Sequence, residues 1–121
     1  MRHSRTWLAL LALWLLTLAC AAPEALSSAG VGGAEASRAE SVYPGKVGRF
    51  EEHHFWPRYL GGPANGRTFK LPAPYHQLIT NAFRQRWEYG RSPPDPQVAQ
   101  QIMMKVYADH PIPQLIGIPD P

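Results

Sequence analysis

Residues Glu51–Gly62 read Glu-Glu-His-His-Phe-Trp-Pro-Arg-Tyr-Leu-Gly-Gly, and the fold that we expect is built outward from this stretch. It holds two of the chain's five histidines, and imidazole can bind a metal or move a proton near neutral pH. Successive residues of a strand point to opposite faces, so His53 and His54 can take different roles only where the strand ends or bends. Pro57 predicts such an end, because proline has no N–H for a strand ladder.

The segments on either side of this stretch predict a hairpin. Lys46–His54 is expected to be one strand and Thr68–Leu71 the other. Between them, Leu60–Arg67 contains Gly-Gly-Pro and Asn-Gly, which are strong turn signals.

A helix is expected directly after the hairpin, opened by Pro72 and Pro74 and ended near Gly90. Its apolar residues recur at the spacing of one buried helix face. These residues are Tyr75, Leu78, Ile79, Ala82 and Phe83.

A second helix is expected from Asp95, as the N-cap, with Pro96 at the first helical position. Its apolar set is Val98, Ile102, Met103 and Val106. Pro111 and Pro113 are expected to end it, and His110 at its end suits the negative pole of the helix dipole. The Pro-rich tail that follows is expected to be extended.

The N-terminal residues predict where the protein is sent. A basic head precedes the apolar run Trp7–Leu18, which is shorter than a membrane span of about 20 residues. The run ends Leu-Thr-Leu-Ala-Cys, which resembles a bacterial lipobox, so residues 1–19 are expected to be a lipoprotein signal peptide and Cys20 the lipidation site. Cys20 is the chain's single cysteine. This implies a lipid-anchored protein of the outer membrane; the alternative is ordinary cleavage near Ala21 and a secreted protein.

The rest of the chain divides by composition into a linker and a domain. Residues 20–40 are rich in Ala, Gly, Ser and Glu, without aromatics, and are expected to be a flexible linker behind the lipidated cysteine. Residues 41–121 are expected to form one small domain, of a size at which a metal would help stability. The formal net charge of +3 permits phosphate contacts but does not by itself indicate nucleic acid.

A strand ending in His-His, a loop, a short strand and a helix with His76 in its first turn follow the ββα order of a one-metal nuclease site. A divalent ion must neutralise the scissile phosphate, and a neutral imidazole must accept a proton from the attacking water. Both must be held a few ångströms apart on a rigid scaffold.

The residues that carry this order resemble a known signature. His53–Pro57 and Leu71–His76 match the His-His-x-x-Pro and Leu-Pro-x-x-x-His of HNH (His-Me finger) nuclease toxins. Joined to a lipoprotein signal, the pattern is similar to the Sit-type polymorphic lipoprotein toxins, which pass between sibling cells by outer-membrane exchange. The resemblance implies an α+β fold with a small ββα-metal core, here with an additional C-terminal helix.

The resemblance also implies roles for particular residues. His53 and His76 would be metal ligands for a divalent ion of the Mg²⁺ class or Zn²⁺, His54 the general base, and Asn65 the group that orients this base. Thr80 stands where the family often has a further histidine. The metal ligand that this histidine would supply could be replaced by Thr80, Asn81, Glu52 or water.

The implied activity is hydrolysis of phosphodiester bonds in the DNA or RNA of sibling competitor cells, with a cognate immunity protein as partner. A second hypothesis is a non-enzymatic outer-membrane lipoprotein that binds a protein partner. In that case the histidines would be surface or capping residues, and Glu51 and Glu52 would only solvate a strand edge. Arginines suited to phosphates would likewise be solvated charges, namely Arg58, Arg67, Arg84 and Arg86.

Overall fold

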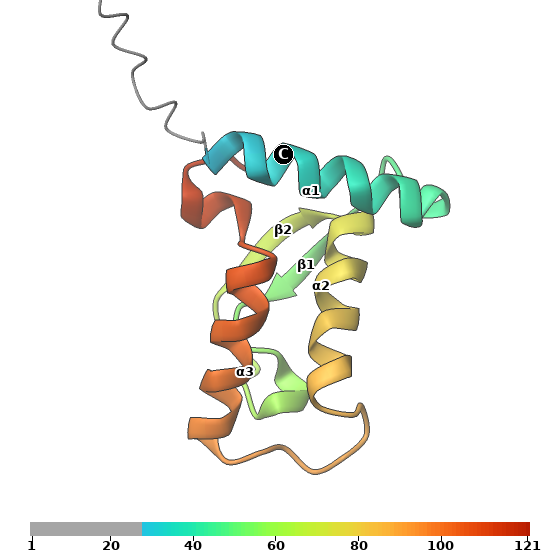
Figure 1. Cartoon of the computed structure of the whole chain (residues 1–121). Coiled ribbons are helices and arrows are strands. Elements are labelled where there is room, and N and C mark those ends of the chain that lie inside the picture. The colour runs from blue at the N-terminus through green and yellow to red at the C-terminus, as the bar shows by residue number, and fades with distance from the viewer. Residues whose placement is uncertain (1–27) are drawn as a thin grey trace, which may run out of the picture.

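A computed structural model describes residues 28–121 of the chain (Figure 1). This part is an α+β structure with one two-stranded antiparallel sheet and three α-helices. The expected signal peptide, Cys20 and the first part of the expected linker lie outside the described residues. In chain order the elements are α1 (Ser28–Val42), η1 (Pro44–Lys46), β1 (Phe50–His54), η2 (Arg58–Leu60), β2 (Thr68–Pro72), α2 (Ala73–Arg86), α3 (Pro96–Asp109) and η3 (Pro113–Ile116), where η marks a 3₁₀ turn.

The predicted hairpin is confirmed. β1 and β2 pair antiparallel, with His53 opposite Phe69 and His54 opposite Thr68. β1 starts later than the expected Lys46, because Lys46 ends the 3₁₀ turn η1 and Gly48 follows with a φ of 82°. β1 ends at His54, as the proline three residues later predicted.

Both predicted helices are present. α2 begins directly after Pro72 and buries Tyr75, Ile79 and Phe83. It ends at Arg86, before the expected Gly90. The side chain of Asp95 caps α3 by accepting a 2.9 Å hydrogen bond from the Gln97 N–H.

The buried face of α3 differs from the expectation at one position. Val98 is 38 % exposed, whereas its neighbour Ala99 is fully buried. The small alanine lies where α3 approaches the core closely, and Ile102, Met103 and Val106 continue that face as expected.

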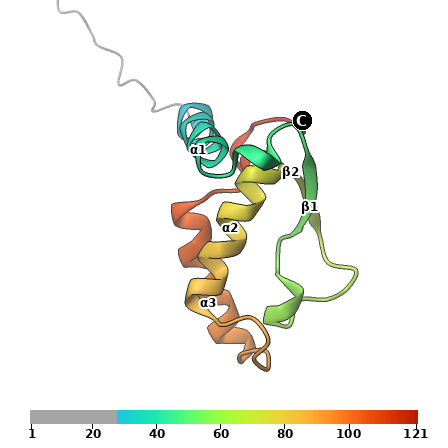
Figure 2. The ribbon, with the colours of Figure 1, turned by 90° about the vertical axis from the view of Figure 1, so that its right-hand side faces the viewer.

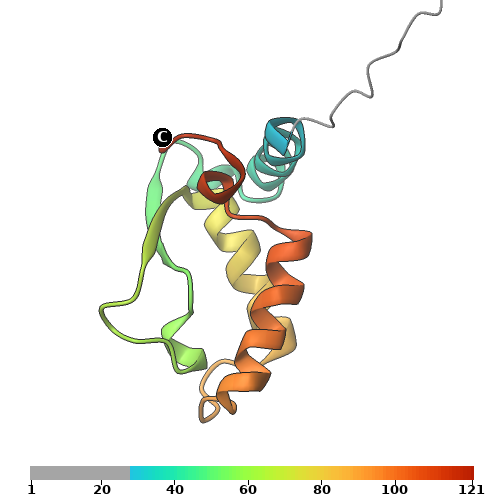
Figure 3. The same ribbon diagram turned by 90° about the vertical axis from the view of Figure 1, so that its left-hand side faces the viewer.

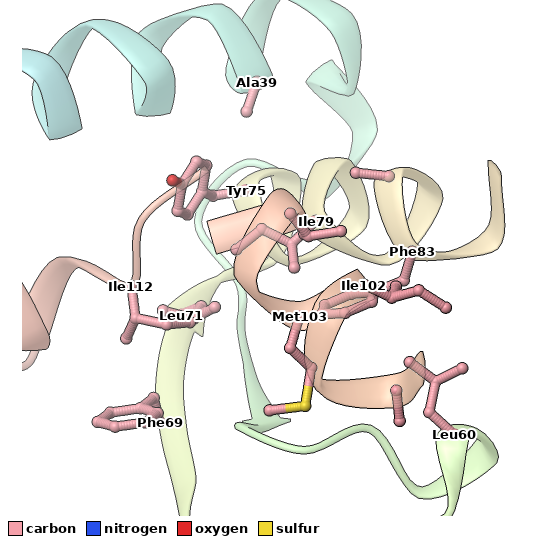
Figure 4. Packing of buried hydrophobic residues seen from close by; sticks show 13 residues of the cluster. Ala39, Leu60, Phe69, Leu71, Tyr75, Ile79, Phe83, Ile102, Met103 and Ile112 are labelled. Atoms are coloured by element: carbon pink, nitrogen blue, oxygen red, sulfur yellow. The ribbon is translucent and has the colours of Figure 1, made fainter. Parts of the chain in front are cut away.

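The hairpin and the helices form layers. Figures 1 to 3 show the hairpin on one side of a helical layer in which α2 and α3 lie side by side, with α3 running antiparallel to α2. Side chains from all of these elements meet in one hydrophobic core, shown in Figure 4. Tyr75, Ile79 and Phe83 come from α2, Ile102 and Met103 from α3, and Leu71 from β2.

The structure differs from the flexible linker expected over residues 20–40. Ser28–Val42 is a helix that lies across the end of the helical layer (Figure 1). Ala39 is fully buried in the core, and Glu35 Oε2 lies 2.9 Å from His110 Nδ1 at the end of α3. Composition did not reveal this because the tertiary contacts, rather than an apolar stripe, fix the helix. The packed unit therefore begins before Ser41.

The tail is not extended as expected. Pro113–Ile116 forms a 3₁₀ turn, and Ile112 before it is buried. Gln114 donates a 2.7 Å hydrogen bond to the Lys70 carbonyl, which fastens the tail to β2. Within the described residues, none of the helices combines the length and apolarity needed to cross a membrane.

Candidate functional site

Glu51, His53 and His76 come together where β1 packs on the first turn of α2. Glu51 and His53 are two residues apart on a strand, so they share a face. His76 Nδ1 donates a hydrogen bond to Glu51 Oε2. The rings of His53 and His76 lie edge to face, with centroids 5.2 Å apart. Residues from a strand and from a helix thus form one cluster of two imidazoles and a carboxylate.

His53 is held as a neutral ring with one defined tautomer. It is 4 % exposed, and its Nε2 lies 2.9 Å from the Tyr107 hydroxyl of α3. That hydroxyl gives its only proton to the Phe55 carbonyl, so His53 Nε2 must be the donor and Nδ1 carries a lone pair. Burial lowers the pKa of His53 to about 3, and the nearby charges of His76 and His54 act in the same direction.

His76 is oriented by the carboxylate of Glu51. Because Nδ1 donates to Glu51, the other ring nitrogen, Nε2, is left to bind a ligand. The hydrogen bond from His76 lowers the pKa of Glu51, as does Lys46, whose Nζ lies 3.2 Å from Oε1; partial burial opposes both. A carboxylate behind one histidine and a hydroxyl behind the other match the outer-shell groups that orient metal-binding imidazoles.

The lowered pKa of His53 predicts an acid-sensitive fold. The folded pKa of about 3 lies below the ordinary 6.5, so the unfolded chain binds a proton at pH values where the folded chain does not. This contribution to stability is complete above pH 6.5 and is lost toward pH 3, at up to about 1.4 kcal/mol per pH unit. We expect urea unfolding in EDTA to show a steeper loss between pH 6.5 and 4 for wild type than for His53→Gln. Equal slopes would contradict this expectation.

Tyr107→Phe should loosen His53 without changing the packing. The ring stacks on Phe55 at 5.1 Å and meets Phe83 at 5.4 Å, contacts that phenylalanine keeps. The lost hydroxyl leaves the His53 N–H and the Phe55 carbonyl unpaired, at a cost of about 1–3 kcal/mol. Denaturant unfolding would measure this cost, and ¹⁵N shifts of His53 should show a mixed tautomer.

Tyr89→Phe is the matched control for that variant. Tyr89 is 65 % exposed, so its hydroxyl should matter by no more than about 0.5 kcal/mol. A Tyr107→Phe protein as stable as this control, with an unchanged His53 tautomer, would show that the hydroxyl does not hold the ring.

His54 lies at the end of β1 with its ring toward the loop that joins the two strands. Its Nε2 is 3.4 Å from the Ala64 carbonyl, a long contact. Asn65, the residue expected to orient His54, is exposed and makes no side-chain hydrogen bond within the described part of the chain. The neighbouring backbone carbonyl contacts His54 instead.

The residues considered for a third ligand are not gathered at the cluster. Asn81 donates a 2.8 Å hydrogen bond to the Tyr43 hydroxyl and accepts one of 2.9 Å from Gln77. Glu52 is exposed and lies on the opposite face of β1 from His53. Residues 28–121 contain no group of three or more His, Cys, Asp or Glu side chains placed to hold a metal. Thr80 is half-buried without a side-chain hydrogen bond in this range.

Glu51 and Tyr107 were missed by sequence reasoning. The sequence did hold a signal for Glu51: it stands two residues before His53 in the expected strand, and residues two apart in a strand share a face. Tyr107 follows the buried Met103 by one helical turn, which signals only that it faces the core. Nothing local relates it to a histidine in another element.

Comparison of the chain with protein-family models, with curated proteins and with solved structures found no match. What the cluster can do therefore follows from its own groups. The free nitrogens of His53 and His76 can bind a cation, and His54, the next residue in the chain with its ring toward the loop, can accept a proton.

Proposed function

We propose that this protein is a metal-dependent nuclease of the HNH (His-Me finger) type. In this proposal β1, β2 and α2 form the ββα-metal core, and the reaction is hydrolysis of a phosphodiester bond in DNA or RNA. The observation that carries the proposal is the contact between the His53 ring of β1 and the His76 ring of α2, whose centroids are 5.2 Å apart. A further histidine, His54, is the last residue of β1.

The donor chemistry fits a divalent ion held by His53 and His76. Each ring has one nitrogen engaged by Tyr107 or Glu51, which leaves the other as a ligand. Zinc–imidazole bonds are about 2.0–2.1 Å long, so rings this close can share one ion. Imidazole favours Zn²⁺ or another first-row transition ion over Mg²⁺, which prefers oxygen. Water and substrate phosphate would complete the coordination.

When bound, the ion would neutralise charge on the scissile phosphate and the leaving oxygen. His54 would accept the proton of the attacking water, because it follows His53 at the end of the strand and is not itself needed to hold the ion. Glu51 would keep His76 in the tautomer that presents Nε2. Tyr107 would do the same for Nδ1 of His53.

The proposal extends to where the protein acts. Residues 1–19 would be a lipoprotein signal peptide, and a lipid on Cys20 would anchor the chain to the outer membrane. The domain would act as a polymorphic toxin after transfer to a sibling cell. A producing cell would then need an immunity protein that covers this site.

The test is cleavage of plasmid DNA and of RNA with Zn²⁺, Ni²⁺, Mn²⁺ or Mg²⁺ supplied, and with EDTA. The full chain should be used, because a protein that starts at Ser41 lacks the buried Ala39 and the contact of Glu35 with His110. We expect cleavage that requires the ion and is lost in EDTA. A full chain that cuts neither substrate with any of the ions would remove the proposal.

One observation favours the second candidate, a non-enzymatic outer-membrane lipoprotein that binds a protein partner. His53 is buried and hydrogen-bonded, and His76 is paired with Glu51, as in a satisfied structural cluster. On this reading His53→Gln would change stability only. Metal titration of the wild type separates the two, since a structural cluster should not bind Zn²⁺.

A further inference from the structure

A hollow lies next to the loop that contacts His54, and the nuclease proposal does not use it. It is lined by Arg58, Tyr59, Gly62, Ala64 and Tyr89, with an open volume of about 640 Å³. Ala64 is also the residue whose carbonyl lies near His54 Nε2, so the hollow adjoins the proposed general base.

The hollow has an aromatic wall. Tyr89 is 65 % exposed, so its ring is accessible to a ligand. Its ring lies 5.6 Å from that of Tyr59. The guanidinium of Arg84 lies over the Tyr89 ring, 4.8 Å from its centroid, so a cation covers one face of this ring.

The charge around this wall suits an anion. Arg58 and Arg84 are exposed, and neither belongs to an ion pair among the described residues. The loop also carries two acidic residues, Glu88 next to Tyr89 and Asp95, whose side chain caps α3. Stacking surfaces beside arginines are the usual platform for unpaired nucleotides, because every base has a π-face and every linkage a phosphate.

The wall is held in place by contacts between two loops. The Tyr59 hydroxyl donates a 3.3 Å hydrogen bond to the Trp87 carbonyl. Gly61 lies against Pro93, where an added Cβ would be 3.5 Å from the Pro93 Cβ. Both loops lie at the end of the molecule away from α1 (Figure 1). A preformed surface of this kind loses little entropy on binding.

We propose that this hollow binds one or two unpaired nucleotides of the substrate strand, with a base against Tyr89 and Tyr59 and phosphates at Arg58 and Arg84. The proposal rests on the nuclease function and narrows its substrate to single-stranded or locally opened nucleic acid. A paired base hides the faces that such a wall would stack on. The bound nucleic-acid strand would run from the hollow past Ala64 to His54.

The test is fluorescence anisotropy with labelled single-stranded DNA, single-stranded RNA and a duplex, using the full chain with His54→Ala in EDTA so that nothing is cut. We expect Tyr89→Ala and Arg84→Gln each to weaken single-strand binding by roughly 5- to 100-fold. Tyr89→Phe should bind like the parent chain, because the ring is kept. Duplex should bind more weakly and respond little to Tyr89→Ala.

Phe50→Ala is the matched control. Phe50 is 48 % exposed and has Lys70 over its ring at 5.0 Å, so it is a similar aromatic–cation pair outside the hollow. It should alter binding by no more than roughly twofold. Equal losses in Phe50→Ala and Tyr89→Ala, tight binding of duplex, or no binding of single strands would each overturn the subsite.

The two proposals fail separately. If the wild type cuts nucleic acid but Tyr89→Ala binds and cuts normally, the subsite is lost and the nuclease stands. If single strands bind through Tyr89 but no ion supports cleavage, the nuclease is lost and the subsite stands.

Discussion

Replacement of His54 by alanine is expected to lower metal-dependent cleavage by about 10²–10⁴-fold, the usual contribution of a positioned general base. His54 directly follows the proposed ligand His53 at the end of β1, and its ring lies near the Ala64 carbonyl. Alanine removes the proton acceptor but leaves both proposed ligands in place. The variant should therefore still bind Zn²⁺, which titration calorimetry would show, while its cleavage rate falls.

A matched control is Met104→Ala, a truncation of an α3 side chain that is 73 % exposed. It should cut like the wild type. Equal cleavage by His54→Ala and wild type would point to a contaminating nuclease or to another base, and would contradict the role of His54. Both variants should first be compared by circular dichroism, so that a folding defect is not read as a catalytic one.

Gly62→Ala is expected to destabilise the fold by about 3 kcal/mol or more. A Cβ at Gly62 would lie 2.1 Å from the Trp56 carbonyl oxygen and 2.9 Å from Trp56 Cδ1. Neither side can move freely. The Gly62 N–H donates to the Pro57 carbonyl at 3.2 Å, and the Trp56 indole donates to the Leu60 carbonyl at 3.1 Å.

Gly45→Ala is the control for this substitution. Nothing lies within 4 Å of an added Cβ there, and Gly45 has no positive φ. Its unfolding free energy should stay within about 0.5 kcal/mol of wild type. Urea denaturation measures the unfolding free energy of both variants. If Gly62→Ala were as stable as Gly45→Ala, the close contact of Gly62 with Trp56 would not restrict the side chain at this position.

Local chemistry was enough to predict much of the fold. Turn glycines between two short strands predicted the hairpin, because few residues adopt the required turns. Asp95 followed by Pro96 predicted the start of α3, since a side-chain cap and a fixed φ act within one turn. The spacing of Tyr75, Ile79 and Phe83 predicted the face that α2 buries.

The candidate site was predicted only in part, for the same physical reason. That β1 would end at the histidine pair followed from Pro57, and His76 followed from its place in the first turn of α2. The contacts of His54 did not follow, because the loop from η2 to β2 can fold in several ways. Its fold in the structure brings Ala64, rather than the side chain of Asn65, to the ring.

By itself, the sequence determined the elements whose signals lie within a few residues: the hairpin, the starts of α2 and α3, and the end of β1 at His54. Only the tertiary structure decided that residues 28–42 are a helix docked through Ala39, and that Glu51 and Tyr107 set the tautomers of the two histidines. Those contacts join residues far apart in the chain. They form because burial makes an unpaired polar group costly, which is a property of the packed molecule and not of any local stretch.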